Sequence, residues 1–318
     1  MARIRHWALG LAASLLLAAC DLTQQAPEAT GHSEPPRNRP VQPQGDAGNG
    51  HAAQTAVPAD RAGGRLLVSW NLEWFMDPEH GPVDDVRQLN GARMALGALG
   101  AELIALQEIA TPAALQALLA ALPGYDGVLS SYEWPQRLAL VFRAPLQLQE
   151  VREVDGLDAV GRPPLEVSLR DERDGSELIA IVVHAKAFAD ESSWERRARF
   201  AAGLHAYLVE QHPGGRVLIA GDFNDQLLSS TVTGRASPYA VFVDDPRFLT
   251  PTAELERSGE DGSTARGGAL LDHIVLGAAL GSELIPGSAD VLRGELLARD
   301  PSLSATVSDH FPVALRLR

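Results

Sequence analysis

The sequence predicts one layered α/β domain that extends from about residue 65 to residue 318. Short apolar runs flanked by turn residues recur along this stretch, and such runs are typical of strands. Segments whose apolar residues recur at helical spacing lie between some of these runs. The mixed order of strands and helices favours a single layered domain, and the sequence shows no internal repeat and no second domain boundary.

The strands are predicted from seven apolar runs, each bounded by turn-forming or charged residues. They are RLLVSW (65–70), ELIALQ (102–107), RLALVF (137–142), ELIAIVVH (177–184), RVLIAG (216–221), ALLDHIVLG (269–277) and FPVALRLR (311–318).

Three helices are predicted between the strands. Apolar stripes over residues 86–99 and 194–208 each bury one face of a helix, because their members are spaced by three or four positions. Thr111 and Pro112 form an N-cap followed by proline at the first helical position, which predicts a helix through AALQALLAAL.

The composition limits the possible functions. The chain has 318 residues, of which 45% are hydrophobic, so it can build a sizeable core. Its formal net charge of −14 argues against broad non-specific attachment to nucleic acid or to an anionic membrane. A polyanionic substrate must therefore be bound by local cations, which include metal ions.

The first twenty residues, MARIRHWALGLAASLLLAAC, predict an export signal. They combine a basic start at Arg3 and Arg5, an apolar stretch too short to cross a bilayer comfortably, and small residues before Cys20. The closing LAAC resembles a bacterial lipobox, which implies cleavage before Cys20 and attachment of a lipid to it. We therefore expect an exported bacterial lipoprotein that is anchored to a membrane and faces the periplasm or the cell exterior. A plain secretory signal is the alternative.

Two further expectations concern the rest of the exported chain. Cys20 is the only cysteine, so the domain contains no internal disulfide and depends on its core. Residues 21–64 are rich in Pro, Gly, Gln and Asn and have almost no large apolar side chains, so we expect them to form a disordered tether.

Polar side chains of a restricted kind follow the apolar runs, at the positions where the strands should end. Strand tips that meet at one edge would bring several carboxylates together, and these would repel one another without a bound cation. Oxygen-rich sites of this kind suit Mg²⁺, with Mn²⁺ as the alternative. The residues are Asn71, Glu73, Glu108, His184, Asp222, Asn224, Asp272, Asp309 and His310.

Six motifs resemble those of the endonuclease/exonuclease/phosphatase superfamily. They are SWNLEW, LQE, a histidine at a strand end, GDFN, DHI and SDH, in this order over residues 69–310. This group includes pancreatic-type deoxyribonucleases, abasic-site endonucleases, sphingomyelinases and inositol polyphosphate phosphatases. The resemblance implies a four-layered α/β sandwich, with two packed mixed β-sheets flanked by helices. It also implies metal-dependent hydrolysis of a phosphate ester. We infer no obligate protein partner.

The resemblance also implies roles for the metal-binding residues. Glu108 is similar to the main metal ligand of the superfamily, with Asn71 and Glu73 close to the ion. Asp309 resembles a second acid near the metal, or else a simple cap of a turn or helix.

The remaining motif residues resemble the catalytic group. Asp222 is similar to the carboxylate that orients or deprotonates the attacking water, and Asn224 to the amide that holds the phosphate and this acid. His184 and His310 are expected to flank the phosphate, and Asp272 to support one of the two imidazoles. The sequence leaves open which imidazole it supports.

Cations outside the motifs are weaker candidates. Arg137 lies near a position where superfamily members often place a phosphate-binding cation, but a surface arginine is an equally good interpretation. Asn71 is also a candidate for substrate binding. Arg196, Arg197 and Arg199 either follow a nucleic-acid backbone or form a solvated helix face.

The chain is expected to be a Mg²⁺-dependent phosphodiesterase that hydrolyses phosphate esters by in-line attack of an activated water. An extracytoplasmic nuclease that acts on DNA or RNA is the leading interpretation. The alternatives are a phospholipid-headgroup phosphodiesterase similar to sphingomyelinase, a phosphomonoesterase and a non-catalytic binding module.

Overall fold

A computed structural model describes residues 64–157, 162–259, 262–266 and 268–318. The predicted export signal and all but the last residue of the predicted tether lie outside the described residues. The described part has no helix that combines the length and the apolar character needed to cross a membrane.

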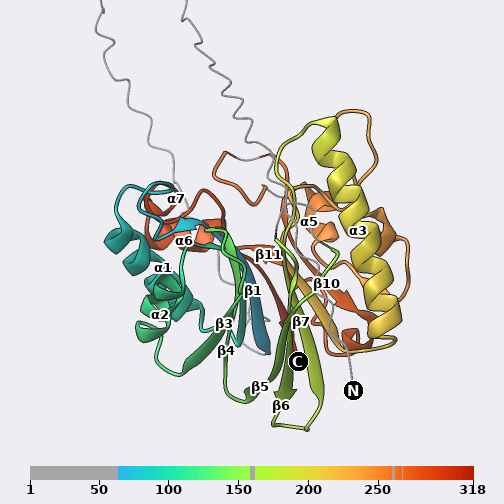
Figure 1. Ribbon diagram of the computed structural model, residues 1–318, viewed down its shortest axis with the longest axis horizontal. Helices are drawn as coiled ribbons and strands as arrows, with labels where there is room; N and C mark the ends of the chain where they lie inside the picture. The colour runs from blue at the N-terminus through green and yellow to red at the C-terminus, as the bar shows by residue number, and fades with distance from the viewer. Residues whose placement is uncertain (1–63, 158–161, 260–261, 267) are drawn as a thin grey trace, which may run out of the picture. The chain divides into compact units, whose positions relative to one another are not determined.

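The described chain forms two mixed sheets of six strands each (Figure 1). The first sheet has the order β11-β12-β1-β2-β4-β3 and the second the order β5-β6-β7-β8-β10-β9. The first sheet consists of β1 (Arg65–Phe75), β2 (Leu103–Ile109), β3 (Tyr125–Leu129), β4 (Arg137–Arg143), β11 (Asp290–Val291) and β12 (Val313–Leu317). The second consists of β5 (Leu146–Glu153), β6 (Leu165–Asp171), β7 (Glu177–His184), β8 (Val217–Asp222), β9 (Phe248–Leu249) and β10 (Asp272–Gly277).

Helices cover the outer faces of both sheets. In Figure 1, α1 and α2 lie on the left beside the first sheet and α3 on the right beside the second. The helices are α1 (Asp85–Leu99), α2 (Pro112–Ala120), α3 (Glu191–Gln211), α4 (Ala240–Val243), α5 (Ala253–Ser258), α6 (Arg293–Arg299) and α7 (Leu303–Thr306), with a 3₁₀ helix η2 (Ala278–Leu280).

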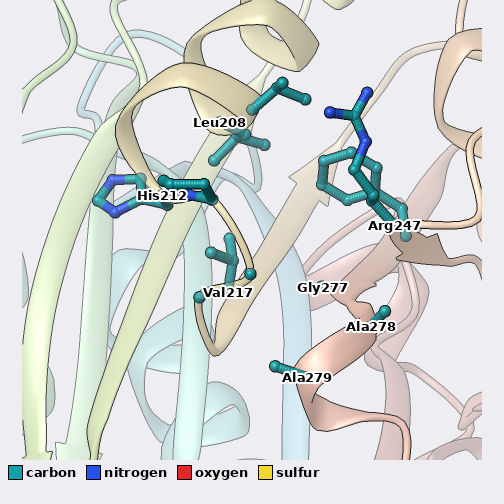
Figure 2. A pocket seen from close by; sticks show the side chains of 12 residues that line it. Leu208, His212, Val217, Arg247, Gly277, Ala278 and Ala279 are labelled. Carbon is teal, nitrogen blue, oxygen red and sulfur yellow. The ribbon is translucent and has the colours of Figure 1, made fainter.

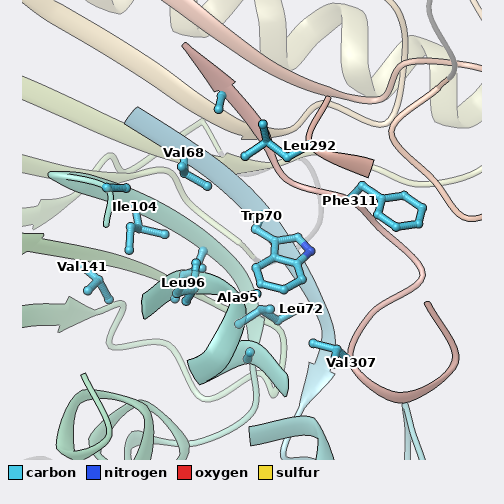
Figure 3. Packing of buried hydrophobic residues seen from close by; sticks show 14 of the residues in the cluster. Val68, Trp70, Leu72, Ala95, Leu96, Ile104, Val141, Leu292, Val307 and Phe311 are labelled. Atoms are coloured by element: carbon cyan, nitrogen blue, oxygen red, sulfur yellow. The ribbon is translucent and has the colours of Figure 1, made fainter. Parts of the chain in front are cut away.

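Three hydrophobic clusters hold these layers together. One cluster joins α1 and α2 to the first sheet, around Trp70 and Leu96 (Figure 3). A second fills the space between the two sheets, where Leu140 and Val167 lie, and a third joins α3 to the second sheet around Leu204. Helices outside two packed sheets are the four-layered α/β sandwich that the sequence predicted, so the predicted fold class is confirmed.

All seven predicted strands are present, but the sequence missed others. The missed strand β5 lies at a sheet edge and is exposed along most of its length, so it lacks the apolar pattern of a buried strand. The missed strand β3 is also an edge strand, and its residues are only partly buried. In β6 the buried positions include Glu166 and Ser168, which interrupt the apolar run.

The three predicted helices are present, with one correction to a buried face. The face of α1 that packs inward is formed by Gln88, Ala92, Ala95 and Leu96, whereas Val86 from the predicted stripe is 68% exposed. The α2 helix begins as predicted, because Thr111 Oγ1 accepts a hydrogen bond from Ala114 N at 3.1 Å.

The sheet topology brings distant motifs to one edge of the sandwich. In the first sheet β1 and β2 are parallel, and in the second sheet β7 and β8 are parallel, so the ends of each pair meet. The antiparallel strands β10 and β12 begin at these same ends. In the register of the second sheet, His184 lies beside Asp222, and Asp222 lies beside Asp272. We call this edge of both sheets the acidic edge.

Candidate active site

Backbone strain is concentrated at the acidic edge. Register shifts interrupt the β1–β2 pairing after Asn71 and the β2–β4 pairing after Leu106. Positive φ angles are uncommon for residues other than glycine, and they persist only where the surrounding structure enforces them. The described residues other than glycine with positive φ are Glu73, Trp74, Met76, Glu108, Phe188 and Asn224, and each lies at or just beyond the end of a strand at this edge.

Gln88 of α1 holds the irregular end of β1. Its Nε2 donates to the carbonyl oxygens of Leu72 at 2.9 Å and Glu73 at 3.0 Å, and its Oε1 accepts from Met76 N at 2.8 Å. Nε2 also lies 2.9 Å from the carbonyl oxygen of Val307. Sequence reasoning missed this residue, because a glutamine on an amphipathic helix looks like a surface side chain.

Asn71 connects the two sheets at the centre of the edge. Its Nδ2 donates to Glu108 Oε1 at 3.0 Å and to Asp222 Oδ2 at 3.1 Å, while its Oδ1 accepts from Glu73 N at 3.0 Å. The side chain is buried. In this arrangement the amide oxygen is already bonded, and Asn71 holds two carboxylates close together.

Three carboxylates gather beside Asn71. Glu108 Oε2 accepts from Trp74 N at 2.9 Å, and Glu73 Oε2 accepts from Asp309 N at 2.8 Å. Burial and the negative charges of Asp309 and Glu108 raise the pKa of Glu73 to about 7. Part of this rise comes from repulsion between the acids, so a cation placed among them is favoured.

His184 lies between two carboxylates. Its Nε2 is 3.7 Å from Glu108 Oε1 and 3.5 Å from Asp222 Oδ2. Burial, together with the positive charges of Arg162 and His310, holds the pKa of His184 well below its ordinary value. Its Nδ1 has no hydrogen-bond partner within the described part of the chain. A neutral imidazole protonated on Nε2 agrees with these surroundings.

His310 forms a pair with Asp272. Its Nδ1 is 2.7 Å from Asp272 Oδ2, and both side chains are buried. Burial alone would lower the pKa of His310, but the Asp272 carboxylate outweighs this effect and raises the pKa to about 10. Of the two imidazoles left open by the sequence, Asp272 therefore contacts the one of His310.

Asp222 is the carboxylate that faces both imidazoles. Its Oδ2 lies 3.5 Å from His184 Nε2 and 4.0 Å from His310 Nε2, and its Oδ1 accepts from Asn224 N at 2.9 Å. Burial and the nearby Asp272 charge raise the pKa of Asp222 to about 7. A carboxylate with this pKa can accept a proton near neutral pH.

Asn224 adopts a left-handed conformation with φ of 53°, which asparagine tolerates better than most residues. Its backbone N–H holds Asp222, and its Nδ2 donates to the carbonyl oxygen of Ala185 at 3.2 Å. The loop after β7 is thereby connected to the loop after β8.

Two arginines lie near the edge. Arg137, a predicted candidate for substrate binding, pairs with Ile109 across β2 and β4 and donates to the carbonyl oxygen of Ser130 at 3.5 Å. Arg162 was not found from the sequence, because it follows no strand tip. It donates to the carbonyl oxygen of Ala185 at 3.0 Å, and its charge contributes to the lowered pKa of His184.

The arginines of α3 do not form one exposed row. Arg197 is fully buried and bonds Asp225 Oδ2 through Nε at 3.1 Å and Nη2 at 2.9 Å. Arg199 is exposed and lies 3.9 Å from Glu195. Arg197 is therefore excluded from the predicted contact with a nucleic-acid backbone, because a helix turns its neighbouring positions toward different sides.

Asp222, Asp272 and His310 each offer a ligand atom within 4.8 Å of the others, close enough to hold one metal ion. The short hydrogen bond between Asp272 and His310 occupies one imidazole nitrogen, which is then not free to bind a metal ion. Glu73 and Glu108 are carboxylates, so each would contribute only oxygen ligands. Oxygen donors with unbalanced negative charge are what a hard divalent cation prefers. The residues at the edge therefore fit such an ion.

His273 and His212 do not face this group. The buried His273 contacts Thr252 and the backbone oxygens of Asp225 and Leu270, on the opposite face of β10 from Asp272, because successive side chains of a strand face opposite sides. His212 borders a cavity of about 140 Å³ where β8 begins and β10 ends, far along both strands from the acidic edge (Figure 2).

The two packed sheets and the group of acids and imidazoles at one edge define a class of protein, the deoxyribonuclease I-like α/β sandwich. The family model for the endonuclease/exonuclease/phosphatase family matches residues 68–310. The chain therefore belongs to this family, whose members are phosphoesterases and nucleases, and the superfamily predicted from the motifs is confirmed. No curated protein matches the chain significantly.

Solved structures show the same fold. The chain is similar to TDP2 from D. rerio complexed with single-strand DNA product, with 15% identity and a TM-score of 0.62 over 80% of this chain and 98% of that one. The catalytic domain of human Nocturnin with bound sulfate shares 21% identity, with a TM-score of 0.60 and coverage of 80% and 94%. The mannosyl-6-phosphatase from Bacteroides thetaiotaomicron shares 16% identity, with a TM-score of 0.56 and coverage of 80% and 99%.

Proposed function

We propose that the protein is a Mg²⁺-dependent phosphodiesterase that hydrolyses DNA or RNA outside the cytoplasm. The observation that carries this proposal is the position of Asp222, whose Oδ2 faces both imidazoles and is bonded by the same amide as Glu108. A base, two imidazoles and an anionic oxygen cluster at one edge are the groups that hydrolysis of a phosphate ester needs.

The acids of the first sheet are proposed to hold the ion. Glu108 and Glu73 would be ligands, with Asp309 close by and Asn71 holding Glu108 in position. A bound Mg²⁺ would neutralise charge on the phosphate oxygens and orient the substrate. Mn²⁺ suits the same oxygen ligands.

The remaining residues perform proton transfer and charge stabilisation. Asp222 is proposed to accept the proton of the attacking water, because its pKa of about 7 makes it an effective base near neutral pH. His310 remains protonated beside Asp272 and is proposed to stabilise the developing charge on the phosphate. Neutral His184 donates its Nε2 hydrogen toward the same place.

The choice of a nucleic acid as substrate is supported by one of the similar folds, since the D. rerio TDP2 structure contains single-strand DNA product. The lipobox-like LAAC sequence supports an exported lipoprotein, anchored through Cys20 and facing the periplasm or the cell exterior. An enzyme at such a location would encounter DNA or RNA that lies outside the cytoplasm.

The test is an assay of the full chain against DNA, RNA, sphingomyelin vesicles and inositol phosphates, each with Mg²⁺ and with EDTA. We expect hydrolysis of DNA or RNA that EDTA abolishes and that the Asp222→Ala variant lacks. Turnover of sphingomyelin or inositol phosphates without cleavage of nucleic acid would overturn the choice of substrate. No turnover of any of the four would favour a binding module.

A further inference from the structure

The loop that follows β7 has a strained residue with no part in the proposed chemistry. Phe188 has a φ of 80° and is 70% exposed. A bulky aromatic residue seldom adopts a positive φ, and the other described residues that share this feature belong to the motif group or to the bulge beside it. Strain of this kind persists only where the surroundings enforce it, so an exposed phenylalanine held in this way requires an explanation.

A buried arginine enforces this conformation. Arg197 Nη1 donates to the carbonyl oxygens of Lys186 and Phe188, both at 2.8 Å. The other side of the guanidinium bonds Asp225, which is fully buried and also accepts from Ser230 Oγ at 2.8 Å. A planar guanidinium with several fixed donors is well suited to hold two carbonyl groups and a carboxylate together. The loop is therefore rigidly positioned, although its aromatic ring points into solvent.

Lys186 places a positive charge beside this ring. Its Nζ lies 4.3 Å from the centroid of the Phe188 ring, close enough for a cation–π contact. Burial and the nearby positive charge of Arg196 lower the pKa of Lys186. The loop thus presents one aromatic face and one cation side by side.

This pair lies close to the proposed catalytic group. The preceding residue, Ala185, accepts from Asn224 Nδ2 at 3.2 Å, and its N–H donates to the carbonyl oxygen of Asp222 at 2.9 Å. His184 comes directly before it. The loop that carries Lys186 and Phe188 therefore begins directly beside Asp222 and Asn224.

We propose that Phe188 and Lys186 form a subsite for the nucleotide next to the reacting phosphate, an inference that rests on the proposed nuclease function. The base stacks on the exposed ring of Phe188, and Lys186 binds the neighbouring phosphate. Every base has a π-face, so stacking on an aromatic side chain gives affinity without sequence preference.

The loop is better suited to a nucleotide than to a membrane. Insertion into lipid needs a face with several apolar side chains. In the segment AKAFAD (185–190), the single large apolar residue stands between small residues, a lysine and an aspartate. One ring beside one cation matches one base and one phosphate.

The experiment compares variants of the full chain on a short single-stranded DNA whose cleavage position has been mapped. Phe188→Ala should lower kcat/KM about 5- to 150-fold, the fold-change that corresponds to loss of one base–aromatic stack. Phe188→Trp should restore activity, because it restores the π-face. The control is Met94→Ala, which removes another exposed apolar side chain from α1 and should leave kcat/KM unchanged.

A modified substrate identifies the stacked base. When the nucleotides beside the cleavage position lack their bases, the wild type should lose activity as Phe188→Ala does on normal DNA, and Phe188→Ala should lose little more. Lys186→Gln should reduce the slope of log kcat/KM against log salt concentration by about 0.7, the value for loss of one phosphate contact on a single strand. Equal losses on both substrates, or an unchanged salt slope, would overturn the subsite.

Failure of this inference differs from failure of the proposed function. If the wild type cleaves DNA and Phe188→Ala behaves like Met94→Ala, the subsite is wrong and the nuclease stands. If the wild type cleaves no nucleic acid, the proposed function is wrong. The affinities of the wild type and of Phe188→Ala for the same DNA, measured in Ca²⁺, then test the subsite separately. A variant that binds anionic vesicles less tightly but DNA unchanged would assign the loop to a membrane.

Discussion

The acidic side chains at the two ends of the sandwich have different partners. At the end where β1 and β8 begin, the buried acids Asp171 and Glu102 are paired with arginine: Asp171 with Arg65 and Arg173, and Glu102 with Arg173. Glu283 at this end is likewise bonded by Arg65 and Arg216. At the acidic edge, Glu108, Asp222 and Asp272 lie within 4.0 Å of histidine nitrogens, and none of these three carboxylates is paired with an arginine of the described residues.

The pKa values express this difference. Burial alone would raise the pKa of Asp171, but hydrogen bonds from Arg173 lower it instead. Burial and a neighbouring carboxylate raise the pKa of Asp222 to about 7. One end gains stability from its charges, whereas the other stores repulsion that a divalent cation would relieve. Buried acids that face one another without an arginine or lysine partner therefore indicate a functional site rather than a structural one.

The largest expected effect comes from replacing one aspartate at each end of the sandwich by asparagine, in two separate variants. Asp222→Asn should reduce turnover about a thousandfold or more, because the proposed base is lost. Asp171→Asn should leave turnover near the wild-type value and lower Tm, since Arg65 and Arg173 lose a buried partner. Steady-state kinetics and thermal melts of both variants test this contrast. Retention of more than about a tenth of the activity in Asp222→Asn would exclude Asp222 as the base.

The acidic edge should also make stability depend on pH when metal is removed. The folded-state pKa of Asp222, about 7, exceeds its ordinary value of 3.8. Its contribution is therefore fully present below about pH 4 and is lost as the pH rises through 7. Glu73 and His310, whose pKa values are also raised, change in the same direction.

In EDTA, we expect a loss of about 2 kcal/mol between pH 5 and pH 8, or about 4–8 °C in Tm for a domain of this size. Mg²⁺ should restore Tm at pH 8 and have less effect at pH 5, because its ligands must lose their protons. Asp222→Asn should reduce the decline in EDTA. A Tm in EDTA that rises over this range would contradict the repulsion at the acidic edge.

A smaller effect is expected from the uncharged hydrogen bonds by which Gln88 holds the backbone at the acidic edge. Gln88→Met keeps the length of the side chain but removes its bonds to Leu72, Glu73 and Met76. We expect a loss of about 1–3 kcal/mol of stability, because buried backbone groups remain unbonded.

The same variant tests whether Gln88 positions the proposed metal ligands. The Mg²⁺ concentration for half-maximal activity should rise several-fold, because the conformation at Glu73 and Trp74 is no longer enforced. Gln149→Met, on the exposed edge strand β5, is the matched control. A lower Tm with unchanged Mg²⁺ dependence would make Gln88 a purely structural residue.

The smallest effect is expected from the exposed part of the paired end. Arg173 is 40% exposed, so Arg173→Ala should cost about 1 kcal/mol, or about 2–4 °C in Tm. Added salt should reduce the difference from the wild type, since exposed charges are screened. Activity should remain unchanged. A loss of activity would show that the two ends are coupled through the strands.

The sequence predicted the strands best where burial produced a clear pattern. The runs that became β7 and β8 are apolar because they lie inside the sandwich. The edge strand β5 escaped detection because most of its residues face solvent. The motif residues were also visible, since acids, amides and imidazoles directly after buried strands are unusual outside turns and sites.

Residues that act through contacts across the fold were not visible. Gln88 and Arg197 donate hydrogen bonds to backbone carbonyl groups. Every residue type has such a carbonyl, so the sequence does not indicate which residues accept these bonds. The pairing of Asp272 with His310 rather than His184 depends on how β10 and β12 face each other. The separation of 38 residues between them carries no such information.

The layered α/β fold class, the order of the buried strands and the polar residues at their ends were predictable from the amino-acid sequence alone, because burial and backbone periodicity act locally. The tertiary structure decided which side chains meet: which imidazole Asp272 contacts, which acids remain without arginine partners, and which arginine is buried. Such pairings depend on distances in space between residues far apart in the chain, and local patterns do not encode those distances.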